Sequence, residues 1–282
     1  MSEPRYPYVH VDVASDEVEE VSYLLWELGA QGVEERDGTT LARNDANHVT
    51  LVASFESDEA AGMAISELAQ WSPRLEHVVG DAWRENYKKF FKVTRLGERL
   101  VIRPSWEPYE PAPSDVVVTV DPGRAFGTGT HESTRLLMMQ LDRIVRGGER
   151  VLDVGCGTGI LAICALKLGA RDAYCIDVDP DAVEVTRENA ASNQVAPQVE
   201  ASTQDVADVQ GQYPLVLANI QATVLIPLAT PIAARVAPGG TLLLSGILLG
   251  QEGEVQAAYP GFSLEAAPVE GEWIALVLKK TN

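Results

Sequence analysis

A strand that runs directly into a glycine-rich turn and then into a helix constrains the fold of this chain most. Residues 151–159 read Val-Leu-Asp-Val-Gly-Cys-Gly-Thr-Gly, and residues 160–168 have a helical pattern. Glycine lets the backbone approach a ligand closely because it has no Cβ, and the start of a helix presents unpaired N–H groups. The segment therefore indicates a binding site at the end of a strand, although many structural turns share this glycine spacing.

Strand and helix patterns alternate from about residue 150 onward. This alternation predicts an α/β fold with a doubly wound, mostly parallel, Rossmann-like sheet and helices on both faces. The expected strands are 151–154, 173–176, 215–218, 241–244 and 273–278. A buried strand is also expected at 116–120, ahead of a helix that carries Leu136, Leu137 and Leu141.

An acidic residue follows the glycine loop at the spacing of a nucleoside site. Asp177 ends the next strand, 177 − 155 = 22 residues after Gly155, where a carboxylate can accept hydrogen bonds from ribose hydroxyls. Asp179 is expected to cap the following helix, with Pro180 at its first position. A dinucleotide loop needs a small residue where Ile160 stands, so a nicotinamide-dependent oxidoreductase is disfavoured.

Two further segments bear on a ligand site. Residues 121–134 are glycine-rich but lack the Gly-Lys-Ser/Thr ending of a phosphate loop. They form either a turn in which Thr130 or Ser133 caps the next helix, or a loop that closes over a cofactor and brings Phe126 to it. Asn219 is expected at the carboxyl end of strand 215–218, where open α/β sheets bind ligands, and its amide is both donor and acceptor.

The first 80 residues predict a separate, smaller α+β domain of ferredoxin-like β-α-β-β-α-β order. Strands are expected at 8–13, 32–36, 49–55 and 76–80. The first helix, 16–28, is expected to begin with Ser15 as its cap and to end at Gly29. The second begins at Ser57 or Asp58, and its apolar stripe extends to Trp71.

Residues 81–110 are predicted to contain a linker helix and a connecting segment, and the catalytic domain is expected over 111–282. One face of the linker helix is aromatic, since Trp83, Tyr87, Phe90 and Phe91 follow at helical spacing. That face either packs on a neighbour or contacts a substrate.

Charge restricts the class of partner. The 41 acidic and 22 basic residues give a net charge of −19. Residues 1–80 hold 16 of these acidic residues and 4 of the basic ones, a net charge of −12. Such a field repels nucleic acid, so direct nucleic-acid binding is not expected. It would attract a basic partner, or it serves solubility alone.

Cysteine and histidine usage suggests a reducing compartment and no metal site. The three cysteines, Cys156, Cys164 and Cys175, form no Cys-x-x-Cys pair, and the four histidines are scattered. No apolar run reaches about 18 residues, so no membrane span is expected. The N-terminal residues do not resemble a secretory signal.

Taken together, the motifs resemble the ribosomal protein L-eleven (L11) methyltransferase family, a class I S-adenosylmethionine-dependent family. The matching segments are Asp-Pro-Gly-x-Ala-Phe-Gly-Thr-Gly-Thr-His from residue 121, the glycine loop, Ile-Asp-Val-Asp-Pro from 176 and Ala-Asn-Ile from 218. Arg-Pro-Ser-Trp at 103–106 and Glu-Trp at 272–273 extend the likeness.

The resemblance implies a small substrate-recognition domain, a linker and a methyltransferase domain. It implies S-adenosyl-L-methionine as donor, and as acceptor the lysine side-chain or N-terminal amino groups of L11, a basic ribosomal protein. A cytoplasmic monomer is expected. The cofactor-binding residues, as the resemblance and the loop motifs place them in this chain, are Thr134, Gly155, Gly157, Asp177, Asn219 and Phe126. Asn219 is also the candidate for positioning the amine in catalysis.

This sequence departs from the family near the expected path of the acceptor. Gln221 and Val224 stand where the family usually has Leu and Pro. An amino group of another protein or of a small molecule is therefore an alternative acceptor, and an acidic binding protein without catalysis is a rival outside the enzymes. His131 is either a general base or a structural loop residue.

Overall fold

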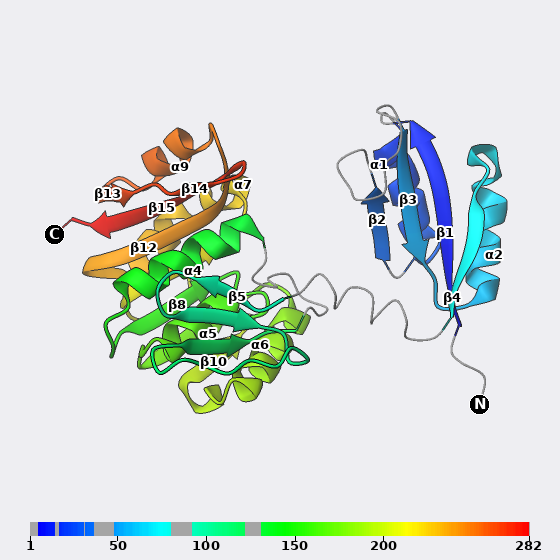
Figure 1. Cartoon of the computed structure of the whole chain (residues 1–282). Coiled ribbons are helices and arrows are strands. Elements are labelled where there is room, and N and C mark those ends of the chain that lie inside the picture. The colour runs from blue at the N-terminus through cyan, green and yellow to red at the C-terminus, as the bar shows by residue number, and fades with distance from the viewer. Residues whose placement is uncertain are drawn as a thin grey trace. The chain divides into compact units, whose positions relative to one another are not determined.

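The computed structural model describes residues 5–14, 17–30, 32–36, 48–79, 92–121 and 131–281 (Figure 1). The chain forms two compact units, residues 1–90 and 91–282. The predicted aromatic linker helix, with Trp83, Tyr87, Phe90 and Phe91, lies outside the described residues, as does Phe126. None of the helices in the described ranges has the length and apolar character that crossing a membrane requires.

The first unit has the predicted β-α-β-β-α-β order and an antiparallel sheet with strand order β2-β3-β1-β4. Its elements are β1 (Arg5–Ala14), α1 (Val18–Glu27), β2 (Gly32–Arg36), β3 (His48–Ser54), α2 (Asp58–Glu67), the 3-10 helix η1 (Ala69–Trp71) and β4 (Arg74–Val79). Val9, Val11 and Val13 alternate into the core, where Val21 and Leu25 of α1 meet them. This alternation confirms the strand that the sequence predicted.

Two details of this unit differ from the prediction. Helix α1 begins at Val18 with Glu17 as its N-cap, and Ser15, the predicted cap, lies outside the described residues. Helix α2 ends at Glu67, and Trp71 lies in η1, where its indole Nε1 donates to Glu17 Oε1 at 3.1 Å. The predicted cap of α2 is confirmed, because the Ser57 side chain accepts from Ala60 N.

The second unit is built on a mostly parallel sheet, as predicted, and this sheet has eight strands. The order is β10-β9-β8-β11-β12-β15-β13, and β14 pairs with β15. The strands are β8 (Arg150–Val154), β9 (Asp172–Ile176), β10 (Val199–Ser202), β11 (Tyr213–Asn219), β12 (Val236–Leu248), β13 (Phe262–Ala266), β14 (Val269–Glu270) and β15 (Trp273–Lys280). The sequence did not predict β10, β13 or β14; β15, β13 and β14 add the antiparallel edge.

Helices cover both faces of this sheet. They are α4 (Glu132–Ile144), α5 (Ile160–Lys167), α6 (Pro180–Ser192), η2 (Ala196–Gln198), α7 (Ala222–Leu225), α8 (Ala229–Arg235) and α9 (Glu252–Ala258). Strand residues alternate between two cores: Leu217 and Leu243 pack with α4 to α6, and Val216 and Leu242 pack with α7 to α9. Because both faces are buried, the central strand β11 is mostly apolar over Leu215–Ala218.

A small three-stranded sheet precedes the main one. It consists of β5 (Thr94–Leu96), β6 (Leu100–Arg103) and β7 (Val116–Thr119), and β7 is the strand expected at 116–120. The sequence did not predict β5 and β6, which lie in the range expected to be a connecting segment and here form part of the second compact unit.

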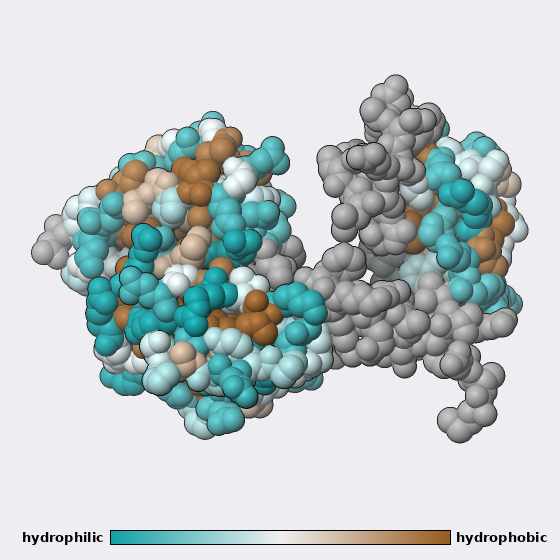
Figure 2. Space-filling view, in the orientation of Figure 1, coloured by the Kyte–Doolittle hydropathy of each residue, from teal (hydrophilic) through white to brown (hydrophobic). Residues whose placement is uncertain are grey.

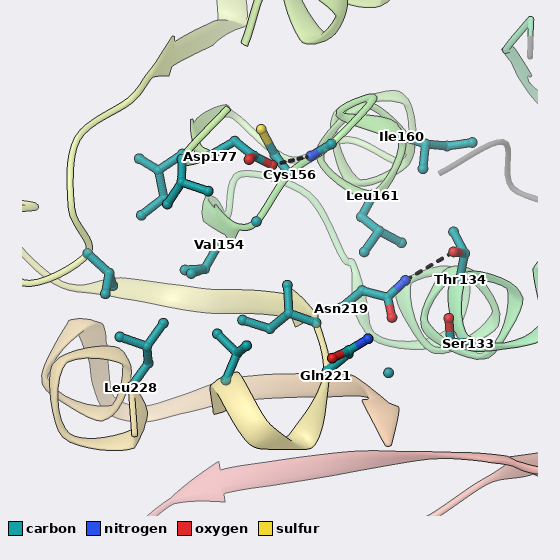
Figure 3. Close-up of a pocket in the computed structure, with 18 of the residues that line it drawn as sticks. Ser133, Thr134, Val154, Cys156, Ile160, Leu161, Asp177, Asn219, Gln221 and Leu228 are labelled. Atoms are coloured by element: carbon teal, nitrogen blue, oxygen red, sulfur yellow. Dashed lines mark hydrogen bonds between the residues drawn. The ribbon is translucent and has the colours of Figure 1, made fainter. Parts of the chain in front are cut away.

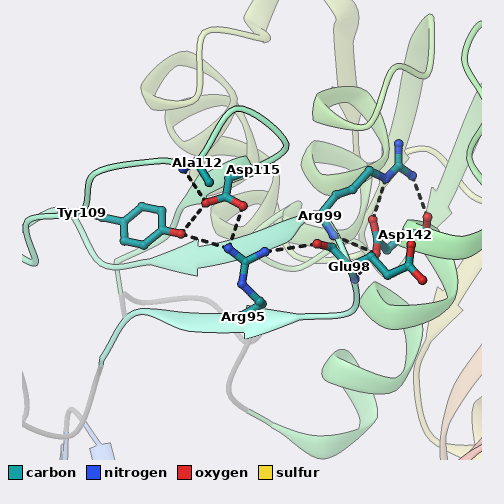
Figure 4. A network of polar contacts seen from close by, with 7 residues as sticks. All are labelled: Arg95, Glu98, Arg99, Tyr109, Ala112, Asp115 and Asp142. Carbon is teal, nitrogen blue, oxygen red and sulfur yellow. Dashed lines mark hydrogen bonds and ion pairs between the residues drawn. The ribbon is translucent and has the colours of Figure 1, made fainter.

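Two buried carboxylates hold this small sheet in place (Figure 4). Asp115 accepts from Tyr109 Oη at 2.5 Å, Arg95 Nη2 at 2.6 Å and Ala112 N at 2.8 Å. The hydrogen bond from Tyr109, followed by those from Arg95 and Ala112, lowers the pKa of Asp115 to about 2. The carboxylate therefore stays ionised, and the proline-rich loop before β7 stays anchored, down to strongly acidic pH.

Asp142 joins the β5–β6 turn to α4. Its Oδ2 accepts from the backbone N–H groups of Glu98 at 2.6 Å and Arg99 at 3.1 Å, and its Oδ1 accepts from Arg99 Nε at 3.0 Å. Gly97 in this turn has φ +73°, and a Cβ there would lie 2.5 Å from Asp142 Oδ2. The carboxylate thus takes the space that only a glycine leaves open.

We expect Asp142→Ala to lower the free energy of unfolding by about 2–4 kcal/mol, because three N–H donors lose a buried ionised acceptor. A urea titration of the full chain measures this loss. Glu184→Ala is the control: Glu184 pairs with Arg187 on the surface, and its removal should cost less than about 0.5 kcal/mol. Equal losses for the two variants would contradict the anchoring role of Asp142.

Candidate functional site

The second unit holds a cavity of about 660 Å³ at the carboxyl ends of its parallel strands (Figure 3). It opens at β8, which lies between β9 and β11 in the sheet. Successive strands are added on one side of β8 as far as β10 and then on its other side from β11. Open α/β sheets bind their ligands at such a switch point. The lining residues include Thr134, Gly155, Gly157, Asp177 and Asn219, and also His131, Gln204, Asp205, Gln221, Val224 and Trp273. Five of the six residues expected at a cofactor thus line one cavity, and Phe126 lies outside the described residues.

The glycine loop connects β8 to α5, and each of its glycines adopts a positive φ. The values are +70° at Gly155, +54° at Gly157 and +73° at Gly159. A Cβ at Gly155 would lie 2.5 Å from Ile220 Cγ2, and one at Gly159 would lie 2.7 Å from Thr186 Cγ2. At these two positions glycine is therefore required by close packing within the protein, whereas the sequence suggested close approach of a ligand.

Asp177 and the glycine loop are joined directly. Asp177 Oδ2 accepts from Gly157 N at 2.8 Å, and Oδ1 accepts from Asp179 N at 3.1 Å. Each carboxylate oxygen has a second lone pair available for another donor. Asp179 caps α6 by accepting from Asp181 N, with Pro180 at the first position, which confirms its predicted structural role.

Two side chains of helix α6 donate hydrogen bonds to the backbone of the glycine loop. Thr186 Oγ1 donates to Gly157 O at 2.9 Å, and Asn189 Nδ2 donates to Thr158 O at 2.9 Å. The sequence analysis did not single out these two side chains. They lie one turn apart on α6. This spacing could have identified them only if α6 had been known to pack against the loop.

Asn219 and Thr134 meet across 85 residues of sequence. Asn219 Nδ2 donates to Thr134 Oγ1 at 3.0 Å, and Thr134 is almost fully buried in the first turn of α4. This hydrogen bond orients the N–H₂ group of the Asn219 side chain toward α4. The Asn219 carbonyl oxygen then remains an acceptor at the cavity.

The structure assigns His131 a structural role at the start of α4. His131 is the N-cap, and its Nδ1 faces Ser133 N at 3.3 Å and Ser133 Oγ at 2.8 Å. The prediction that Ser133 caps the helix is therefore wrong, since Ser133 lies inside it, and the other candidate, Thr130, lies outside the described residues. Because Nδ1 accepts from the helix start, taking a proton there would break the cap, which argues against His131 as a general base. Its ring also packs edge-on against Trp273, with centroids 4.8 Å apart.

Sequence reasoning missed the residues that follow β10. Gln204, Asp205 and Val206 line the cavity beside Asp177. The rule that found Asp177 and Asn219, a polar residue just after a parallel strand, would also have found Asp205. It failed here because β10 has only four residues, Val199–Ser202, and no alternating pattern that the sequence reveals.

Asp153 is a buried carboxyl beneath the cavity. Its Oδ2 accepts from Ala162 N at 3.1 Å, and its Oδ1 has no partner among the described residues. Burial, assisted by the nearby charge of Asp177, raises the pKa of Asp153 to about 7. Within the described ranges there is no cluster of three or more His, Cys, Asp or Glu side chains that could hold a metal ion.

Comparison with known proteins gives one consistent family. The family model described as ribosomal protein L11 methyltransferase (PrmA) matches residues 5–281. A ribosomal protein L11 methyltransferase of Sorangium cellulosum (strain So ce56) is 47% identical over 265 residues, 91% of this chain and 84% of that protein. Another, of Geobacter sulfurreducens (strain ATCC 51573 / DSM 12127 / PCA), is 42% identical over 256 residues, 88% of this chain and 84% of that protein.

A solved structure agrees with these relatives. The crystal structure of a ribosomal protein L11 methylase from Lactobacillus delbrueckii subsp. bulgaricus superposes with a TM-score of 0.63 at 32% sequence identity. The match covers 68% of this chain and 100% of that chain.

The raised pKa of Asp153 predicts that stability falls as the pH rises. The unfolded chain releases this proton near pH 4 and the folded chain near pH 7, so the folded state holds more protons between these values, and the free energy of unfolding declines there. Between pH 5 and pH 8 the native chain should lose about 2–3 kcal/mol relative to Asp153→Asn, which does not titrate. Urea titrations at both pH values measure the difference, and parallel pH profiles would contradict it.

Proposed function

The chain belongs to the ribosomal protein L11 methyltransferase family, and we propose that it transfers methyl groups from S-adenosyl-L-methionine to amino groups of ribosomal protein L11. The amines are lysine side chains, the N-terminal amine, or both. The observation that carries the proposal is the extent of the family match, residues 5–281, which runs through both compact units. A match to the second unit alone would support methyl transfer without indicating the acceptor, because such sheets serve many acceptors.

The cavity fits this cofactor in size and in chemistry. Its volume of about 660 Å³ lies within the usual range of about 300–1,000 Å³ for small-molecule sites. We propose that Asp177 accepts from the ribose hydroxyls, that Gly157 leaves the backbone bare beside the ligand, and that Val178 and Val206 give apolar walls to the adenine. When bound, the cofactor supplies a methyl group already activated by its sulfonium.

The protein then mainly has to orient the acceptor. Holding two reactants in line can lower a barrier by about 7–11 kcal/mol. The hydrogen bond from Asn219 Nδ2 to Thr134 turns the Asn219 carbonyl oxygen toward the cavity, where it can accept from the attacking amine. We propose that Asn219 positions the amine and that Thr134 fixes the orientation of the Asn219 amide.

The amine must also be neutral when it attacks. At pH about 7.4, removing the proton from a lysine with a pKa of about 10.4 costs about 4 kcal/mol, and for an N-terminal amine the cost is below about 1 kcal/mol. Apolar lining such as Leu161, Ile220 and Val224 desolvates an amine that enters the cavity, which disfavours its charged form.

The first unit is proposed to dock the protein substrate. Its net charge of −12 over residues 1–80 would attract a basic ribosomal protein. We propose that the enzyme acts as a monomer in the cytoplasm, where ribosomal proteins are assembled. Its three buried free cysteines suit a reducing compartment.

Asp177→Ala should weaken cofactor binding by about 1–3 kcal/mol, because the ribose hydroxyls lose a charged acceptor. Calorimetric titration of the full chain with S-adenosyl-L-methionine gives the affinity. The matched control is Asp179→Ala, two residues away, which removes a helix cap but keeps the N–H that Asp177 accepts. An affinity unchanged in Asp177→Ala, or lowered equally in both variants, would remove Asp177 from the cofactor site.

Salt should weaken recognition of L11 far more than cofactor binding. Raising the ionic strength from about 0.1 to about 1 M shortens the screening length from about 10 to about 3 Å. We expect the KM for L11 to rise at least severalfold and the Kd for S-adenosyl-L-methionine to change less than about twofold. Steady-state methylation assays and calorimetry measure the two quantities. A KM independent of salt would rule out electrostatic docking.

A further inference from the structure

The C-terminal part of the chain carries an unusual charge pattern beside the cavity. From Val236 to Leu278 there are five glutamates and neither lysine nor arginine. This stretch contains β12, α9, β13, β14 and most of β15, and it reaches the cavity through Gly246 and Trp273. Glu272 precedes the cavity residue Trp273 in the chain, so this end of the stretch borders the site and is not assigned to cofactor binding.

Exposed apolar side chains lie at the same border. Leu248 of β12 pairs in register with Trp273 of β15, and Leu249 N donates to Glu272 O at 2.9 Å. Leu248 is 41% exposed, Leu249 51% and the cavity residue Val224 43%. Figure 2 shows brown, apolar surface gathered at the end of this unit that carries α9 and β14. We call Val224, Leu248, Leu249, Glu252, Glu272 and Trp273 the mouth surface.

One basic side chain is paired with a carboxylate beside Trp273. Arg135 of α4 is paired with Glu270 at 2.8 Å, and Glu270 is the register partner of Trp273. The ring of Trp273 is held edge-on by His131. Glu272 itself is exposed, and Glu252 is partly exposed.

The cavity has two ends, and the mouth surface borders only one of them. Asp177, Gln204 and Asp205 follow β9 and β10 at one end, whereas Gly246 and Trp273 belong to β12 and β15 at the other. Asn219, at the end of β11, lies between them in the strand order. If Asp177 holds the ribose, the transferable methyl group lies toward Asn219, and the acceptor has to arrive from the β12–β15 end.

We propose that the mouth surface binds the acceptor segment itself, a cationic stretch of the substrate protein that carries the amine. This inference rests on the proposed function and adds where the acceptor enters. The aliphatic side chains contact the apolar stem or neighbours of the target residue, and Glu252 and Glu272 attract its positive charges. Gln221 and Val224, which line the cavity, then lie on the acceptor's path.

The test compares two pairs of variants in the full chain, with L11 as substrate. Glu272→Lys and Leu249→Ser alter the mouth surface. Glu265→Lys and Leu264→Ser make the same changes on β13, where both side chains are exposed. Leu264 pairs with Leu278, five residues along β15 from Trp273, or about 17 Å away. Each control therefore matches its partner in chemistry and in net charge.

We expect Glu272→Lys to raise the KM for L11 at least about fivefold and Leu249→Ser at least about twofold, with both β13 controls near the native value. The Kd for S-adenosyl-L-methionine should be unchanged in all four variants. If Glu272→Lys and Glu265→Lys change the KM for L11 equally, or if neither mouth-surface variant changes it, the proposal that the mouth surface binds the acceptor is wrong. The proposed function would be unaffected by either result. A native chain that binds the cofactor but does not methylate L11 would overturn both.

Discussion

The hydrogen bond from Gly157 N to Asp177 Oδ2 joins the loop after β8 to the end of β9, and the geometry of the cavity depends on it. It forms because parallel strands that are neighbours in the sheet end at the same edge. Thr186 and Asn189 fix the loop from α6, and the three positive φ values let its backbone turn in so small a space. The carboxylate is therefore set in position before any ligand binds. Because the acceptor is already in position, ligand binding loses little free energy in ordering it.

A second long-range bond sets the other wall. Asn219 and Thr134 come from β11 and α4, and their contact determines which atom of the Asn219 amide faces the cavity. One wall presents the Asp177 carboxylate, which we propose accepts from hydroxyl groups, and the other presents the Asn219 carbonyl oxygen, which we propose accepts from an amine. Between them the lining is apolar. That arrangement suits a reaction in which the protein orients two reactants and excludes water, because the methyl donor is already activated.

The site residues that could be predicted share one local rule. Asp177 and Asn219 each follow a strongly apolar strand, and the strand ends of a parallel sheet converge, so their shared cavity could be inferred without coordinates. The sequence analysis did not identify Asp205, because the strand that precedes it, β10, is too short to be recognised from the sequence. The predicted cap at Ser133 was wrong for a related reason: several residues near a helix start can cap it, and the residue that does so is fixed by where the first turn packs. The short strands β5 and β6 pair with each other, and they also depend on β7 and on Asp142, which lie farther along the chain.

The sequence by itself determined the element order of the first unit, the alternation of strands and helices in the second, the α/β class and the glycine loop with its acid, because each is encoded by local periodicity or by residues close together in the chain. It also carried the motifs by which the chain resembles its family. Only the tertiary structure decided that Gly155 and Gly159 yield space to Ile220 and Thr186, that His131 caps a helix, and that an acidic, apolar surface borders the cavity beside Trp273. Apart from the His131 cap, which involves Ser133 two residues away, these features arise from contacts between segments tens of residues apart, which packing creates and no local pattern records.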